Sequence, residues 1–137
     1  MTHQEMFEFR TRGRGTSDIT AHVAAIVAQC AAAAGVAHVF VRHTSCSLLI
    51  TENADPDVRR DLETLAGRWA PDGDPAYRHD LEGDDDMAAH ARTVLSGTSI
   101  SVPVKDGRLL LGTRQAIYLW EHRTRGHVRE VVVTVLA

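Results

Sequence analysis

The stretch that decides the fold covers residues 99–136, SISVPVKDGRLLLGTRQAIYLWEHRTRGHVREVVVTVL. Four runs rich in apolar residues follow one another within it: 99–104, 108–111, 116–120 and 128–136. Turn-forming residues separate the runs, and Asp106-Gly107 between two apolar runs is typical of a β-hairpin. We therefore predict that the last third of the chain is all strand, which favours a largely antiparallel sheet over a doubly wound parallel one.

The preceding two thirds combine strand and helix patterns without regular alternation. We predict strands over 5–12 and 36–51, the second with a bend or bulge at residues 44–46. We predict three helices: one capped by Asp18 or Thr20 and ended by Gly35, one starting at Asp55-Pro56, and one over 86–96. The expected fold is a single α+β domain over residues 1–137, with a largely antiparallel sheet or sandwich and about three helices.

Composition narrows the class of protein. The chain has 137 residues, 44% of them hydrophobic, and a net charge of −3, which argues against nucleic-acid binding by charge alone. No apolar run approaches the ~20 residues that cross a bilayer, so we expect no membrane partner. The N-terminus shows no apolar signal segment. Cys30 and Cys46 form no C-x-x-C pair, which favours a reducing cytoplasm.

The first candidate site motif is His43-Thr44-Ser45, at the end of a predicted strand. An imidazole and two hydroxyls at a strand end can face a cleft and bind a substrate. The alternative is a structural histidine that is satisfied by a backbone carbonyl at a bend.

The second motif is residues 52–56, ENADP, followed by Arg59 and Arg60. Asn53 and Asp55 can simply cap the helix that starts here. The same helix N-terminus can also attract phosphate, and the two arginines can supply anion contacts.

The third motif is the densest: residues 79–86, HDLEGDDD, followed by His90. A solvated acidic stretch ahead of a helix is one interpretation. Histidines with carboxylates also meet the ligand needs of Zn²⁺, and carboxylates alone can hold Mg²⁺. His79 and His90 are eleven residues apart, so only the fold can bring them together, with His43 as a third nitrogen.

A fourth group of polar residues lies in the last third. Gly112 inside a strand pattern indicates a bulge or a close backbone approach. Gln115, Glu121 and Arg123 are polar ends on apolar strands, whereas Arg125 and His127 are predicted to form a solvated turn.

Four stretches together resemble the YjbQ family, an uncharacterised protein family whose members are often labelled secondary thiamine-phosphate synthases. They are HTSCSLLITENADPDVRRDLE, HDLEGDDDMAAH, SGTSISVPVKDGRLLLGTRQAIYLWEHR and VREVVVTV. The resemblance covers nearly the whole chain, from about Phe7 to the C-terminus. It implies a compact α+β fold, assembly as a homotrimer and a polar cleft. The family usually has tryptophan where this chain has Arg114, so the substrate can differ.

The resemblance implies that the cleft contains His43, Asn53, Asp55, His79, Glu82, His90 and Gln115, and the motifs above add Thr44, Ser45, Arg59 and Arg60. The catalytic groups are Asn53, Asp55, Glu82 and Gln115; the substrate-binding groups are Thr44, Ser45, Arg59 and Arg60; the metal ligands are His43, His79 and His90. The expected cofactor is a divalent metal, Zn²⁺ or Mg²⁺, and the expected partner is a small phosphorylated substrate.

Three hypotheses for the function follow. The first is a metal-assisted, thiamine-phosphate synthase-like transferase that joins a pyrimidine pyrophosphate to a thiazole phosphate. The second is a metal-dependent hydrolase of a small phosphorylated or acyl substrate. The third is a non-catalytic trimer that binds a metal or a ligand.

Overall fold

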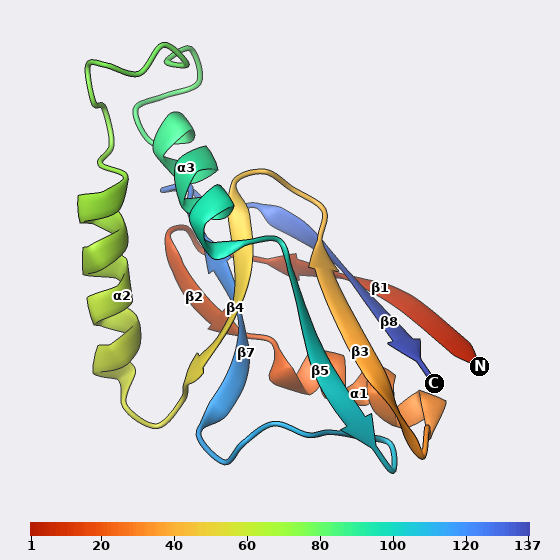
Figure 1. Cartoon of the computed structure of the whole chain (residues 1–137). Coiled ribbons are helices and arrows are strands. Elements are labelled where there is room, and N and C mark those ends of the chain that lie inside the picture. The colour runs from red at the N-terminus through yellow and green to blue at the C-terminus, as the bar shows by residue number, and fades with distance from the viewer.

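The computed structural model describes all 137 residues and confirms an α+β fold with three helices (Figure 1). In chain order the elements are β1 (Thr2–Arg10), β2 (Gly15–Asp18), α1 (Thr20–Cys30), β3 (Ala34–Val41), β4 (Cys46–Glu52), α2 (Pro56–Trp69), α3 (Asp86–Ser96), β5 (Ser99–Lys105), β6 (Arg108–Leu109), β7 (Gln115–Glu121) and β8 (Val128–Leu136). All three helices are too short or too polar to span a bilayer.

The strands form two sheets, and every pairing is antiparallel. The larger sheet has the order β1-β8-β3-β5-β6, and the smaller one has the order β2-β7-β4. The first and last strands, β1 and β8, pair along their whole length, which places the two termini side by side (Figure 1).

The core lies between the inward faces of these sheets, with α1 packed against it. Alternate residues of β8 are fully buried, as are alternate residues of β3. The smaller sheet contributes Leu48, Ile117 and Leu119. Each fully buried aliphatic side chain contributes about 1.5–3 kcal/mol relative to an exposed one. The period-two pattern in the sequence therefore marks the side of each strand that faces the other sheet.

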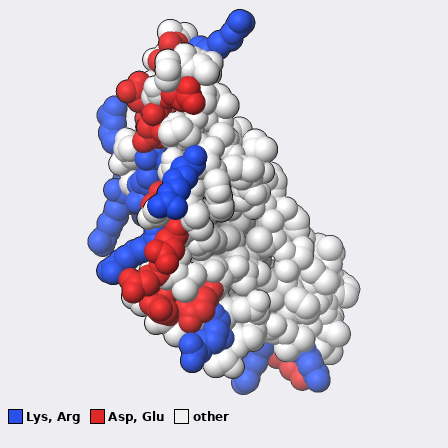
Figure 2. Space-filling view, turned by 60° about the vertical axis from the view of Figure 1, so that its left-hand side comes forward, with Lys and Arg blue, Asp and Glu red and all other residues white.

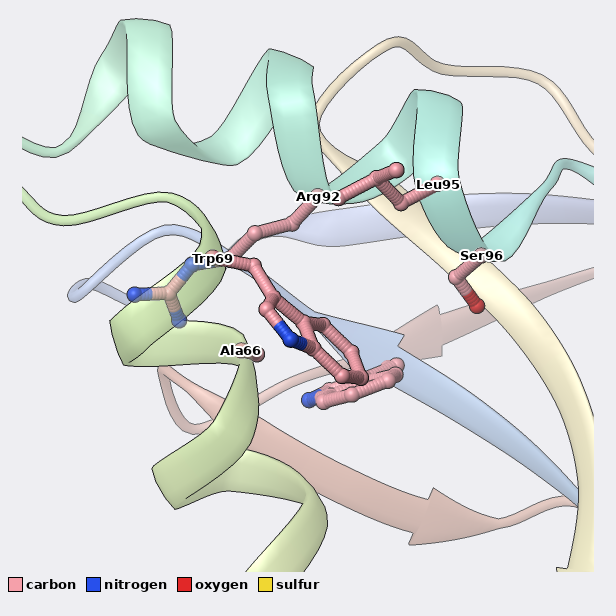
Figure 3. A pocket seen from close by; sticks show the side chains of 6 residues that line it. Ala66, Trp69, Arg92, Leu95 and Ser96 are labelled. Carbon is pink, nitrogen blue, oxygen red and sulfur yellow. The ribbon is translucent and has the colours of Figure 1, made fainter.

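The other face of β7 explains why that strand has a continuous apolar run. Ala116, Tyr118 and Trp120 point away from the core and are buried. Side chains of α2 cover Tyr118, and Trp120 lies at the cavity between α2 and α3. The guanidinium of Arg59 in α2 lies 4.8 Å from the centroid of the Tyr118 ring. Figure 3 shows the junction of the helices, where side chains of both converge on a cavity of about 120 Å³. Its lining residues are Ala66, Trp69, Arg92, Leu95, Ser96 and Trp120.

The prediction of one bent strand over 36–51 is wrong, because β3 and β4 belong to different sheets. Residues 42–45 carry the chain from one sheet to the other. His122 in the β7–β8 connection donates its backbone N–H to the Ser45 carbonyl at 3.2 Å. The crossing places His43 and its neighbours at one open end of the two-sheet core.

The predicted end of the first helix at Gly35 is also wrong. Helix α1 ends at Cys30, and Ala31 adopts a left-handed conformation with φ 51°. Gly35 lies within β3 instead, where a Cβ would approach the Leu136 carbonyl oxygen to 2.3 Å. Neither predicted capping residue is the N-cap, which is Ile19, although the Asp18 carboxylate accepts the Thr20 N–H at 2.9 Å.

The other two helices begin as predicted. Asp55 is the N-cap of α2, and its carboxylate accepts the Asp57 N–H. Helix α3 has the predicted bounds and ends at Gly97. Charged side chains gather over one part of the surface, where acids and bases are interspersed (Figure 2). This face therefore carries no extended field of one sign.

Candidate metal centre

Asp86, the first residue of α3, is the centre of a cluster of ligand-type side chains. Its carboxylate is 2% exposed. His79 Nε2 lies 2.6 Å from Asp86 Oδ2, and His90 Nε2 lies 3.4 Å from the same oxygen. One donor atom from each of these three residues lies within 4.8 Å of the other two. Two imidazole nitrogens and one carboxylate oxygen thus lie close enough together that one metal ion could reach all three.

Local sequence and a long loop together build this cluster. Asp86 and His90 are four residues apart on α3, which places both on one face of the helix. His79 arrives from the loop that connects α2 to α3. The loop is closed by a bond from the Gly73 N–H to the Asp84 carbonyl at 2.9 Å.

Arg123, just beyond β7, anchors the loop to the sheets. Its Nη1 donates to Asp86 Oδ1 at 3.0 Å, and its Nε donates to Asp85 Oδ2 at 2.9 Å. A third bond goes to the Glu82 carbonyl at 2.9 Å. Asp86 therefore uses one oxygen for arginine and presents the other to the two histidines.

The second nitrogen of His90 fixes the orientation of its ring. His90 Nδ1 lies 3.0 Å from the Thr44 carbonyl oxygen, which can only accept, so Nδ1 carries the proton. The lone pair of Nε2 then faces the Asp86 carboxylate, and a cation between the two would satisfy both. A ring N–H held by a backbone carbonyl is also the usual support of a metal-ligating histidine.

The electrostatics favour ionised carboxylates. Burial acts to raise the pKa of Asp86, but the hydrogen bond with His79 and the charge of Arg123 lower it below its ordinary value. Burial likewise acts to raise the pKa of Asp85, yet bonds from Arg123 and the Thr124 N–H lower it to about 2. Both groups are negative at neutral pH, as ligands of a cation must be.

The donor set fits zinc better than magnesium. Zn²⁺ accepts imidazole nitrogen and carboxylate oxygen, whereas Mg²⁺ prefers oxygen ligands alone. Three protein ligands are also the number found in catalytic zinc sites, where a further position is left for water or substrate. His79, Asp86 and His90 therefore form a candidate zinc centre that can present a substrate with a Lewis acid.

His43 lies beside this cluster and outside it. It shares with His90 a groove of about 460 Å³ whose other lining residues are Thr44, Thr93, Val94, Gly97 and Thr98. His43 Nδ1 accepts the Ser45 backbone N–H at 3.1 Å. Burial, and then the positive charge of Arg129, lower the pKa of His43. The side chain of Ser45 is buried below the groove, whereas Thr44 lines it.

The remaining predicted site residues lie at the opposite end of β4 and β7. The Asn53 N–H donates to the Arg114 carbonyl, and Asp55 caps α2. Gln115 Oε1 accepts the Gly112 N–H at 2.8 Å. Strand β4 has 7 residues, so its ends are roughly 20 Å apart. One chain therefore does not bring these groups to the His79–Asp86–His90 cluster.

The predicted phosphate-binding arginines are at that distant end as well. Arg59 Nη1 donates to the Glu52 carbonyl, and Arg60 Nη1 donates to Asp57 Oδ1. Arg114, which replaces the usual tryptophan of the family, is exposed there and reaches Glu52 Oε1 at 3.3 Å. Glu82 differs, because it lies near the cluster and lines a polar pocket with Asp85 and Arg123.

Two residues of the centre were missed in the sequence as site residues, Asp86 and Arg123. The spacing of Asp86 and His90 is a usable signal, because residues four apart lie on one face of a helix and can bind the same ion. His79 and His90, which are eleven residues apart, do not have this spacing. Arg123 gave none, because it meets the cluster through a contact across 37 positions of sequence.

The fold and the cluster define the class: a two-sheet α+β protein with a candidate divalent-metal centre at one open end. Within this class, the chain belongs to the UPF0047 protein YjbQ-like family, whose model matches residues 5–137. The match confirms the resemblance found in the sequence.

Relatives and solved structures extend this assignment. A UPF0047 protein of Synechocystis is 47% identical over 133 residues, which cover 97% of this chain and 90% of the relative. The UPF0047 protein YjbQ of Salmonella typhimurium is 46% identical over 101 residues, covering 74% and 72%. A conserved hypothetical protein from Thermus thermophilus has a TM-score of 0.86 at 36% identity, covering 96% and 99%. An uncharacterised YjbQ/UPF0047 protein from Clostridium acetobutylicum has 0.88 at 33%, with the same coverage.

Proposed function

We propose that this chain is a metal-dependent enzyme that acts on a small phosphorylated substrate in the groove beside His79, Asp86 and His90. The reaction proposed first is of the thiamine-phosphate synthase type. In it, the C–O bond between the pyrimidine methylene and its pyrophosphate breaks, and a C–N bond to the thiazole nitrogen forms. The bonding electrons leave with the pyrophosphate. The observation that supports this proposal is the convergence of three metal-ligand donors next to an open groove.

The chemistry divides between the metal and the chain. A bound divalent metal supplies charge neutralisation to the leaving pyrophosphate. Arg123 holds the Asp86 carboxylate in the ligand position, and the Thr44 carbonyl holds the His90 ring. The hydroxyls of Thr44 and Thr98 line the groove and can orient the substrate.

Assembly remains a proposal of its own. Arg59 and Arg60 can contact a phosphate at the cluster only across a subunit boundary, because within one chain they lie at the far end of β4. The homotrimer implied by the family resemblance is an arrangement that permits such contacts. Measurement of the solution mass tests it, and a monomer would remove Arg59 and Arg60 from the proposed site.

A metal-dependent hydrolase of a phosphorylated or acyl substrate is the second candidate. The observation that favours it is the number of protein ligands, because three leave a coordination position for water. The groove is also open, with His43 and Thr44 both exposed at its edge. Transfer through a reactive pyrimidine cation needs a site that excludes water, whereas hydrolysis does not.

One incubation separates the two reactions. The zinc-loaded protein is supplied with both thiamine precursors, and thiamine phosphate, pyrophosphate and inorganic phosphate are measured. Thiamine phosphate with equal pyrophosphate supports the transferase. Inorganic phosphate without thiamine phosphate supports the hydrolase. Tight binding of phosphorylated compounds without turnover would leave only the non-catalytic, ligand-binding hypothesis.

Matched variants show whether the product is made by this protein or by a contaminating synthase. His79→Ala removes a proposed ligand, whereas Asp84→Asn changes a neighbouring acid outside the cluster. Asp55→Asn tests the predicted catalytic residue at the far end of β4. Activity that is lost in His79→Ala and kept in Asp84→Asn belongs to the proposed site. Equal product from all proteins would refute it.

A further inference from the structure

We propose that His43 is a substrate-binding hydrogen-bond donor, which presents Nε2–H to an anionic oxygen in the groove, and that it is not a metal ligand. This inference rests on the proposed function only for the nature of the substrate, a phosphorylated small molecule. The tautomer of His43 follows from contacts within the chain and can be tested without any substrate.

The decisive contact is at Nδ1 of His43. The backbone N–H of Ser45 donates to this nitrogen at 3.1 Å, and a backbone amide cannot accept. Nδ1 must therefore hold a lone pair, and the proton of the neutral ring must be on Nε2. To ligate a metal through Nε2, the ring would have to move its proton to Nδ1, where two donors would then face each other.

A buried chain of side chains reinforces this tautomer. Ser45 Oγ lies 3.0 Å from His43 Nδ1, and it accepts a bond from Arg129 Nη2 at 3.0 Å. Because arginine only donates, the hydroxyl proton of Ser45 is free to point at Nδ1. Arg129 is held in turn by Glu121, which also accepts Thr11 Oγ1 at 2.7 Å. Ser45, Glu121 and Arg129 are each 1% exposed, so the chain is fixed within the core.

The neighbouring histidine provides the contrast. The Thr44 carbonyl faces Nδ1 of His90, and the next N–H along the backbone faces Nδ1 of His43. One peptide group therefore sets opposite tautomers in the two rings. His90 has a free lone pair on Nε2, as a ligand requires, and His43 has a proton there, as a donor requires.

The groove itself fits an anion. Its lining contains two histidines and the hydroxyls of Thr44 and Thr98, and it contains no carboxylate. The hydroxyl of Thr93, which also lines the groove, donates to the Ala89 carbonyl at 2.8 Å. Donors from His43, Thr44 and Thr98 can surround a phosphate oxygen, while a metal bound at the adjacent cluster would neutralise its charge.

Nitrogen NMR on the wild-type protein tests the tautomer directly. Two-bond ¹H–¹⁵N spectra of the histidine rings separate Nδ1–H from Nε2–H, and His43→Gln assigns the His43 signals. We expect Nε2–H for His43 and Nδ1–H for His90. Added zinc should shift the nitrogens of His79 and His90 strongly and leave Nε2 of His43 protonated. An Nδ1–H tautomer for His43, or its coordination to zinc, would overturn the proposal.

Inorganic phosphate then tests the donor role, with both zinc-free and zinc-loaded protein. The Nε2–H signal of His43 should move as phosphate binds. His43→Phe should weaken phosphate binding by about tenfold. His43→Gln, whose amide N–H can occupy the place of Nε2–H, should weaken it less. Both variants should keep the zinc affinity of the wild type. If the Nε2–H signal of His43 does not shift with phosphate in either the zinc-free or the zinc-loaded protein, the donor role is refuted.

The two proposals fail differently. Absence of zinc binding would remove the proposed function and leave the tautomer and phosphate measurements on the zinc-free protein to decide the role of His43. Ser45→Ala removes the hydroxyl and keeps the backbone N–H, so it should leave the His43 tautomer unchanged and weaken phosphate binding through a less fixed ring. If Ser45→Ala converts His43 to Nδ1–H, the backbone contact does not set the tautomer.

Discussion

The carboxylate of Glu121 and the guanidinium of Arg129 form an ion pair inside the protein, with each side chain 1% exposed. Arg129 Nε donates to Glu121 Oε1 at 2.8 Å. Glu121 ends β7 in the smaller sheet, and Arg129 lies near the start of β8 in the larger one. The pair therefore joins the two sheets at the open end of the core, directly below His43.

Loss of one partner should cost far more than loss of both. Arg129→Met leaves a buried carboxylate without its counterion, and we expect it to lower the free energy of unfolding by about 3–5 kcal/mol. Replacing Glu121 by Leu as well removes the unpaired charge, so the double variant should recover part of that loss. Urea denaturation followed by circular dichroism measures all three proteins. A single variant as stable as the wild type would show that the pair is dispensable.

Acid should destabilise the fold through His122. This residue is fully buried, its Nε2 lies 2.8 Å from Ser47 Oγ, and its Nδ1 has no partner. Burial, with the charge of Arg92 adding to it, lowers the pKa of His122 from 6.5 to about 3. The unfolded chain binds this proton near pH 6.5 and the folded chain does not. Stability from the neutral ring is thus complete above pH 6.5 and decreases as the pH falls toward 3.

The slope gives a quantitative check. One such histidine contributes up to about 1.4 kcal/mol per pH unit across that range. His122→Gln cannot titrate, so its unfolding free energy should fall less steeply than that of the wild type between pH 6.5 and 4. Denaturant midpoints at several pH values measure both proteins. Parallel curves would mean that the folded protein accepts the His122 proton without strain.

The fold was predictable where its signals are local. The strands of residues 99–136 and the bounds of α3 follow from alternation and from Gly97, which act over a few residues. Strand β2 was missed, because Gly15–Asp18 has no apolar alternation and becomes a strand only by pairing with β7. The separation of β3 from β4 was missed for a similar reason, since partner choice is set by contacts far away in sequence.

The candidate centre was predictable only in part. Its two histidines and its acidic loop stand out by residue type. What the spacing could not reveal is the role of the groups around them, such as the Thr44 carbonyl, which meets His90 across 46 positions. The peptide group between Thr44 and Ser45 contacts both rings: its carbonyl faces His90 Nδ1, and its N–H faces His43 Nδ1. The separation of the two rings is therefore a property of the fold at residues 43–45.

Glu63 should prove to be the main polar link between α2 and the rest of the protein. Its Oε2 accepts the Trp120 indole N–H at 2.6 Å, and its Oε1 accepts Arg92 Nη1 at 3.1 Å. Glu63→Ala leaves the buried Arg92 guanidinium without its carboxylate, and we expect a loss of about 1–3 kcal/mol of stability. Trp120 fluorescence should change as well. Asp61→Asn is the control, because Asp61 is exposed on the same helix and makes no ion pair.

Zinc should stabilise the fold, and it should do so through Asp86. A ligand that binds only the folded state adds about 2.7 kcal/mol at a free concentration one hundred times its Kd. Thermal unfolding with increasing zinc should therefore show a rising midpoint for the wild type. Asp86→Asn removes the central carboxylate oxygen, so it should weaken zinc binding by at least roughly tenfold.

The Asp86→Asn variant also loses the charge that faces Arg123, so its stability without zinc will differ from that of the wild type. The zinc-induced shift of the midpoint is therefore the quantity to compare. Asp84→Asn should keep the full shift, because Asp84 lies in the same loop and outside the cluster. Equal zinc-induced shifts in the two variants would show that the metal binds elsewhere on this acidic loop, and the candidate centre would then be only a hydrogen-bonded helix start.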